Sequence, residues 1–78
     1  MYLVINMYTN SDDKQFVNDV VKFGTFNEAW RYMRQCVREA RNDYERDGSL
    51  EDYIETESSV TLKGKHYTDY FEIYYIMN

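Results

Sequence analysis

Proline is absent from this sequence, and only one cysteine and three glycines occur among its 78 residues. Cys36 has no partner for an internal disulfide, a bond that small secreted domains usually contain in several copies. No apolar run approaches the ~20 residues of a membrane-spanning helix. Residues 1–7 are largely apolar but have no basic region ahead of them, so we expect no signal peptide. Together these features predict an intracellular, cytoplasmic protein that does not span a membrane.

Motifs for catalysis or metal binding are also missing. The sequence has no glycine-rich phosphate loop, no paired-cysteine spacing and no H-E-x-x-H pattern. A catalytic thiol needs a base within hydrogen-bond reach, and nothing in the spacing of Cys36 and the only histidine, His66, indicates such a pair. The loop carboxylates do not follow the ligand spacing of an EF-hand. We therefore expect no enzymatic activity, no metal ion and no cofactor.

The chain is rich in aromatic and acidic residues instead. Hydrophobic residues make up 44% of the sequence and aromatic residues 18%, including nine tyrosines, which argues against disorder. This length suits one domain covering residues 1–78. The formal net charge is −5, whereas nucleic-acid-binding proteins normally have an excess of Lys and Arg. Direct binding to nucleic acid is therefore not the expected function.

Alternating side chains predict a β-hairpin at the start of the chain. Residues 2–8 alternate, with Leu3, Ile5 and Met7 on one side of a strand. Residues 10–13 are Asn-Ser-Asp-Asp, whose side chains favour a turn. A second strand is expected around residues 20–23.

A long helix is predicted next. Thr25 and Glu28 have the spacing of a capping box, and Gly48 is the expected residue after the helix end. Between them, apolar residues recur at intervals of three and four, as on one face of a helix. These residues are Trp30, Met33, Val37, Ala40 and Tyr44, with Ala29 and Cys36 widening the face.

The last third of the chain predicts two more strands. Residues 49–58 are acidic and are expected to be irregular, with Leu50, Tyr53 and Ile54 in a helical turn against the core. Residues 59–63 and 66–76 flank Lys63-Gly64-Lys65, a glycine-containing hairpin turn. The predicted fold is α+β with the order ββαββ: an antiparallel sheet of about four strands packed on one long helix. One helix covers only one face of such a sheet.

Acidic residues form the first candidate binding surface. Residues 26–46 carry a net charge of +1, so the remainder of the chain carries −6. Such clusters can imitate the phosphates of a nucleic acid and occupy a basic groove of a partner protein, although solubility alone also explains acidic loops. The candidate residues are Asp12, Asp13, Asp19, Asp47, Glu51, Asp52, Glu55 and Glu57.

Tyrosines form the second candidate surface. Tyr2, Tyr8, Tyr70 and Tyr74 fall on the predicted strand faces opposite the helix. Because tyrosine is favoured at interfaces, this face suits a protein partner or a second copy of the chain. Packing of the rings against one another in cross-strand pairs is the alternative.

Arginines on the helix form the third candidate surface. Arg31, Arg34, Arg38 and Arg41 make one stripe beside the apolar face, at spacings of three, four and three. The stripe fits phosphate contacts to RNA or DNA. It equally fits arginines whose stems cover the edge of the core and whose guanidinium groups pair with carboxylates.

In size, acidity, lack of catalytic motifs and strand-first layout, the whole chain resembles the small acidic proteins of bacterial phages and mobile elements. Some of those proteins inhibit host defences such as CRISPR nucleases. The resemblance implies a non-enzymatic protein-interaction module, an acidic nucleic-acid mimic that inhibits a nucleic-acid-handling host protein. The alternatives are a small nucleic-acid-binding or regulatory domain that uses the arginine stripe, and a structural homodimer.

Overall fold

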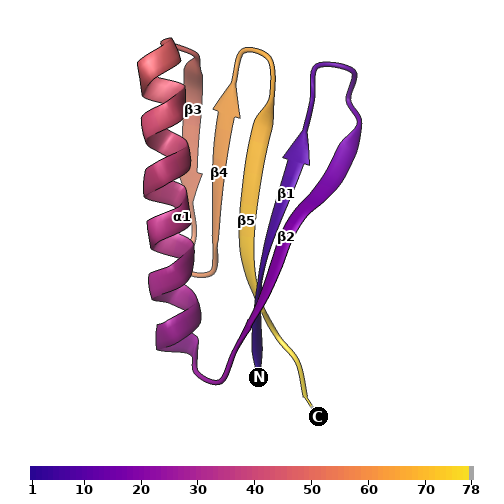
Figure 1. The fold of residues 1–78 in the computed structure, drawn as a ribbon, viewed down its shortest axis with the longest axis vertical. Coiled ribbons are helices and arrows are strands. Elements are labelled where there is room, and N and C mark those ends of the chain that lie inside the picture. Colours follow the sequence, from indigo (N-terminus) through magenta and orange to yellow (C-terminus); the bar gives the residue numbers. More distant parts are fainter. Residues whose placement is uncertain (78) are drawn as a thin grey trace.

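Five antiparallel strands form one sheet, and one 22-residue helix packs on one face of it (Figure 1). The strands are β1 (Tyr2–Thr9), β2 (Gln15–Phe23), β3 (Leu50–Glu55), β4 (Ser59–Gly64) and β5 (Thr68–Tyr75), and the helix is α1 (Phe26–Asp47). The strand order is β2-β1-β5-β4-β3, so β5 lies at the centre and β2 and β3 are the edges. This computed structural model describes residues 1–77.

The α+β class and the antiparallel sheet are confirmed, but the predicted order ββαββ lacks one strand. The missing strand is β3, in the acidic segment that we expected to be irregular with one helical turn. Along β3, Tyr53 pairs with Leu62 and Ile54 with Thr61 of β4. Backbone pairing with a neighbouring strand outweighs the weak strand preference of Asp and Glu, because strand formation depends strongly on such context.

The first hairpin is longer than predicted, because β2 begins at Gln15 rather than near residue 20. The predicted turn is confirmed: the side chain of Asn10 accepts hydrogen bonds from the backbone N–H groups of Asp12 and Lys14, at 3.0 and 3.1 Å. Asn6 pairs with Asp19, whereas Met7 pairs with Val17, so Asn18 is an extra residue in β2. This β-bulge bends the hairpin.

Both predicted ends of the helix are confirmed. The Thr25 hydroxyl accepts the Glu28 backbone N–H at 3.2 Å and donates to the Glu28 carboxylate at 2.9 Å. Gly48 adopts a left-handed conformation with φ 65°, which a residue without Cβ reaches at little cost. Trp30, predicted on the buried face, is instead 43% exposed at the edge of the core.

Within the described residues, no helix combines the length and the apolar character that crossing a membrane requires.

The core lies between α1 and the middle of the sheet. The helix contributes four buried residues, and β1, β4 and β5 contribute the others. They are Val4, Ala29, Met33, Val37, Tyr44, Val60, Leu62, Phe71 and Ile73. Every strand residue of this set lies on the sheet face that α1 covers, since side chains at alternate positions of a strand share a face.

The placement of Tyr2 and Tyr8 on the uncovered face was wrong. Both share a face with the buried Val4 of β1. The Tyr2 ring packs edge-on against Phe26 at 5.8 Å, and the Tyr8 ring lies 5.6 Å from Tyr67. Both sides of β1 carry apolar residues, so alternation identifies its two faces without showing which one the helix covers.

Gly64 ends β4 rather than occupying the hairpin turn predicted around it, and the chain reverses at residues 65–67. Its backbone N–H donates to the carbonyl oxygen of Tyr67 at 2.9 Å. The Tyr44 ring lies directly against Gly64: a Cβ placed there would be 2.5 Å from Tyr44 Cε1. The glycine is therefore needed for close packing of the helix on the sheet.

We predict that Gly64→Ala lowers the free energy of unfolding by about 1–3 kcal/mol, the usual cost of an overpacked core. The Tyr44 ring cannot move aside easily, because its hydroxyl donates to Asp69 at 3.1 Å. Gly24→Ala is the matched control, since the nearest side-chain atom would lie 3.9 Å from the new Cβ. Urea denaturation followed by circular dichroism measures both variants. Equal stability of the two would contradict the packing argument.

Candidate functional site

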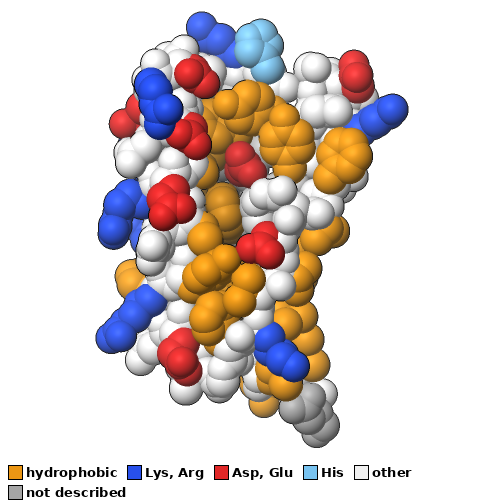
Figure 2. All heavy atoms as spheres, in the orientation of Figure 1, with side chains coloured by type: hydrophobic (Ala, Val, Ile, Leu, Met, Phe, Trp, Pro, Cys, Tyr) orange, Lys and Arg blue, Asp and Glu red, His pale blue; other side chains and the backbone are white. Residues whose placement is uncertain are grey.

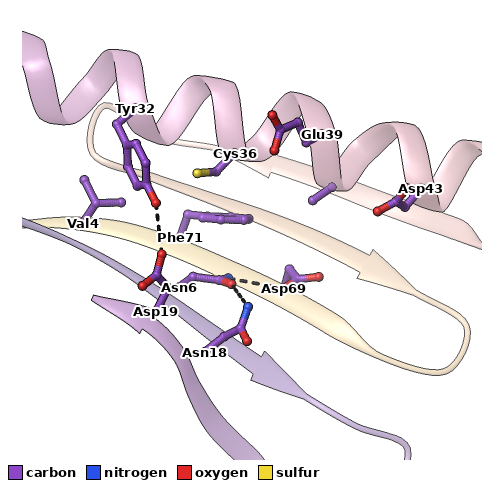
Figure 3. Close-up of a pocket in the computed structure, with 11 residues that line it drawn as sticks. Val4, Asn6, Asn18, Asp19, Tyr32, Cys36, Glu39, Asp43, Asp69 and Phe71 are labelled. Atoms are coloured by element: carbon purple, nitrogen blue, oxygen red, sulfur yellow. Dashed lines mark hydrogen bonds between the residues drawn. The ribbon is translucent and has the colours of Figure 1, made fainter. Parts of the chain in front are cut away.

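A groove with a cavity volume of about 320 Å³ lies between α1 and the β1–β2 hairpin. Figure 2 shows hydrophobic side chains along the middle of this face, with acidic side chains on both sides of them. In Figure 3, side chains from α1 line one wall, and side chains from β1, β2 and β5 line the other. The lining residues are Val4, Asn6, Asn18, Asp19, Tyr32, Cys36, Glu39, Ala40, Asp43, Asp69 and Phe71. We call this feature the acidic groove.

Hydrogen bonds hold the strand wall of the acidic groove in place. The buried Asn6 donates through Nδ2 to Asp69 Oδ1 and to the Tyr70 carbonyl oxygen, both at 3.2 Å, and its Oδ1 accepts from the bulge residue Asn18 at 2.7 Å (Figure 3). The other oxygen of Asp69 accepts the Tyr44 hydroxyl. Burial, followed by the charge of Asp69, raises the pKa of Tyr44. The Asp69 carboxylate is therefore oriented from two sides.

The helix wall meets β2 through Tyr32. Its hydroxyl donates to Asp19 Oδ2 at 3.0 Å, and its ring packs 5.2 Å from Phe23. The neighbouring Cys36 thiol, together with burial and the Asp19 carboxylate, raises the pKa of Tyr32. Tyr32 thus stays protonated and links the two walls at neutral pH.

Glu39 and Asp43 complete the helix wall one turn apart on α1, and both are exposed. Asp43 pairs with Arg46 at 2.7 Å, but both side chains are largely exposed, so the pair screens Asp43 only weakly. No Lys or Arg belongs to the residues that line the groove. Four carboxylates therefore share one concave surface without a cation in its lining, and like charges on one surface repel one another.

The structure does not bring the predicted acidic residues together on one surface. Because β2 and β3 are opposite edges of the sheet, the residues on them lie far apart. Of the predicted set only Asp19 lines the acidic groove. Asp12 and Asp13 lie in the β1–β2 turn, Asp47 at the end of α1, Glu51, Asp52 and Glu55 on β3, and Glu57 in the β3–β4 turn.

The arginine stripe is partly occupied by contacts within the chain. Arg34 pairs with Glu55 and donates to the Tyr53 hydroxyl, and its guanidinium lies 5.6 Å from the Trp30 ring centroid. The Tyr53 hydroxyl and Arg34 lower the pKa of Glu55. Arg41 lies 4.6 Å from the centroid of the Tyr53 ring.

The two remaining arginines of the stripe, Arg31 and Arg38, are exposed. Arg34 and Arg41 therefore behave as arginines that cover the edge of the core. Their guanidinium N–H groups, which would have to contact a phosphate, already contact side chains of this chain.

Glu39, Asp43 and Asp69 were not predicted as site residues. Glu39 and Asp43 lie four positions apart, beside Cys36 and Ala40 on the flank of the apolar helix face. This spacing was the available signal, since residues four apart share a helix face. Asp69 became part of the site only through the register of β5 with β1, which places it beside Tyr8.

No protein-family model, curated protein or solved structure matches the chain. The chemistry of the acidic groove is nevertheless defined by its side chains, which offer acceptor oxygens around apolar and aromatic groups. Among residues 1–77, no three His, Cys, Asp or Glu side chains are grouped so that they could hold a metal ion. The arrangement favours an organic cation with an apolar stem.

Cys36 offers a direct test of the groove's environment. Burial raises the pKa of the Cys36 thiol, and the charges of Glu39 and Asp19 raise it further, although the nearby Tyr32 hydroxyl opposes them. A raised pKa lowers the fraction of thiolate, the reactive form. We predict that iodoacetamide alkylates folded Cys36 several-fold more slowly than the same residue in guanidinium at about pH 8.

The rate of alkylation is measured by intact mass, and Cys36 is the only thiol in the chain. The unfolded chain is its own control for the intrinsic reactivity of the reagent. A folded rate equal to or above the unfolded rate would show that the thiol is neither buried nor surrounded by negative charge.

Proposed function

We propose that this chain is a non-enzymatic protein-interaction module whose acidic groove binds a Lys- or Arg-bearing segment of another protein. The observation that carries the proposal is the composition of the groove lining: four carboxylates around an apolar floor, with no Lys or Arg among them. Acidic residues that serve only to keep a protein soluble do not need to surround an apolar floor. A cationic side chain with a long hydrocarbon stem matches both parts of this surface.

The contacts available to such a side chain are specific. Its stem lies against Phe71, Val4 and Ala40 on the groove floor. Its charged head reaches Asp19 on one wall and Glu39 on the other. Hydrogen bonds between a cation and a carboxylate are roughly twice as strong as neutral ones.

The partner class follows from the same charges. A basic segment that is free to enter an acidic groove is typical of proteins that handle nucleic acids, because their Lys and Arg side chains contact phosphates. With a net charge of −5, this chain attracts such proteins over a distance and competes with nucleic acid for them. An inhibitor of a nucleic-acid-handling defence protein, such as a CRISPR nuclease, acts in this way.

Direct binding to nucleic acid is less well supported. The guanidinium groups of Arg34 and Arg41 already contact Glu55, Glu45 and Tyr53. A phosphate backbone would also approach a chain with an excess of negative charge. The arginine stripe therefore remains the weaker candidate.

Neutralising the helix wall of the groove tests the proposal. We predict that Glu39→Gln/Asp43→Asn weakens binding of a fluorescein-labelled peptide of alternating Arg and Gly by about three- to tenfold, since each exposed ion pair contributes about 0.2–1 kcal/mol. Fluorescence anisotropy measures the affinity. Glu51→Gln/Asp52→Asn on β3 is the matched control, because it removes the same charge from exposed residues outside the groove.

The proposal expects the control variant to bind the peptide with nearly wild-type affinity. Equal weakening by both variants would show that net charge alone attracts the peptide, and would overturn the groove as the site. Binding of random-sequence duplex DNA that falls steeply between about 50 and 200 mM salt would favour the arginine stripe instead.

A further inference from the structure

The sheet face opposite α1 carries an apolar surface that nothing in the described chain covers. Leu3, Ile5 and Met7 of β1 point to this side, since the alternate residues of β1 form the core. Neighbouring side chains from β2 and β5 extend the surface. The part of this side that β1, β2 and β5 form, which we call the open face, is Leu3, Ile5 and Met7 of β1, Val17, Val20 and Lys22 of β2, and Tyr70, Glu72 and Tyr74 of β5.

Strand register arranges the open face in rows. Met7 lies between Val17 and Tyr70, and Ile5 lies between Val20 and Glu72. Val17 is 63% exposed, Val20 49% and Tyr74 40%. An exposed apolar surface that is continuous across three strands marks an interaction site rather than scattered surface residues.

Charge separates the open face from the rest of the molecule. Its charged residues are Lys22 on β2 and Glu72 on β5, so its net charge is zero, whereas the chain carries −5. Glu72 accepts the Tyr70 hydroxyl and raises the pKa of Tyr70 to about 12. The Glu72 carboxyl group is therefore hydrogen-bonded within the open face, among aromatic and aliphatic side chains.

We propose that the open face binds the open face of a second copy of this chain, forming a two-fold symmetric dimer. A two-fold interface must complement itself, because the same patch contributes from both copies. Lys22 and Glu72 lie on opposite sides of β1, one row apart. In face-to-face packing, a two-fold axis that crosses β1 between Leu3 and Ile5, inclined to the strand, brings Lys22 of each copy opposite Glu72 of the other.

The distribution of charge also favours a second copy of the chain as the partner of the open face. Two copies that each carry −5 repel through most of their surfaces, and the open face is where apolar side chains and paired opposite charges offset that repulsion. The dimer leaves both acidic grooves accessible, because α1 and the groove are on the other side of the sheet. The proposal therefore does not depend on the function proposed for the groove.

Sedimentation equilibrium tests the dimer. We expect the mass to rise from one chain of 9.5 kDa to twice that value between low micromolar and near-millimolar concentration. Lys22→Glu and Glu72→Lys each replace both Lys22–Glu72 contacts of the dimer with contacts between like charges. Each variant therefore raises the dissociation constant of the dimer at least tenfold. The double variant Lys22→Glu/Glu72→Lys restores the pairs and recovers the dimer.

Lys65→Glu, in the exposed β4–β5 turn, is the control with the same change of net charge as Lys22→Glu, and it leaves the dimer intact. Circular dichroism confirms that each variant is folded. A wild-type chain that stays monomeric would overturn the proposal, and so would a dimer that neither single variant weakens. A monomer that sediments with phosphatidylcholine vesicles would overturn it in favour of a lipid surface.

Discussion

A helix with its side chains is about 10–12 Å across, whereas the outer strands of a five-stranded sheet lie about 19 Å apart at the usual spacing. One helix therefore cannot cover even one face of this sheet. In Figure 1, α1 lies on the side of the view where β3 is, and the β1–β2 hairpin lies toward the other side. The acidic groove is the uncovered strip on the helix side, and the open face lies on the other side of the sheet. Both candidate surfaces follow from this mismatch of widths.

The alternation of side chains keeps these two surfaces separate although they share strands. On β1, Val4 and Asn6 point toward the groove, while Ile5 between them belongs to the open face. The bulge at Asn18 adds to the groove alone, since its amide donates to Asn6. A substitution on one face therefore leaves the other face largely unchanged, which is why charge variants of the groove and of the open face report on different contacts.

The sequence was sufficient to predict those features whose contacts involve residues close together along the chain. The Thr25 cap, the Gly48 end and the Asn10 turn each involve contacts within a few positions, so residue type and spacing were sufficient to predict them. Strand β3 forms a hairpin with the neighbouring β4, and it was missed because Asp and Glu have a weak strand preference. The covered side of β1 depends on pairing with the distant β5, which spacing does not encode. The acidic groove depends on the same pairing, because Asp19, Glu39 and Asp69 come from three separate elements. Asp19 was predicted as an acidic candidate, but its neighbours were not.

The pairing of β1 with β5 has a consequence for how the molecule is made. Tyr2 lies beside Tyr75 and Thr9 beside Thr68, so β1 waits until β5 has been synthesised before its second edge is filled. Until then the β1–β2 hairpin has an open edge, and such edges are templates for pairing with other chains. Because contacts between distant residues form slowly, a growing chain of this protein is most vulnerable to aggregation just before β5 is complete.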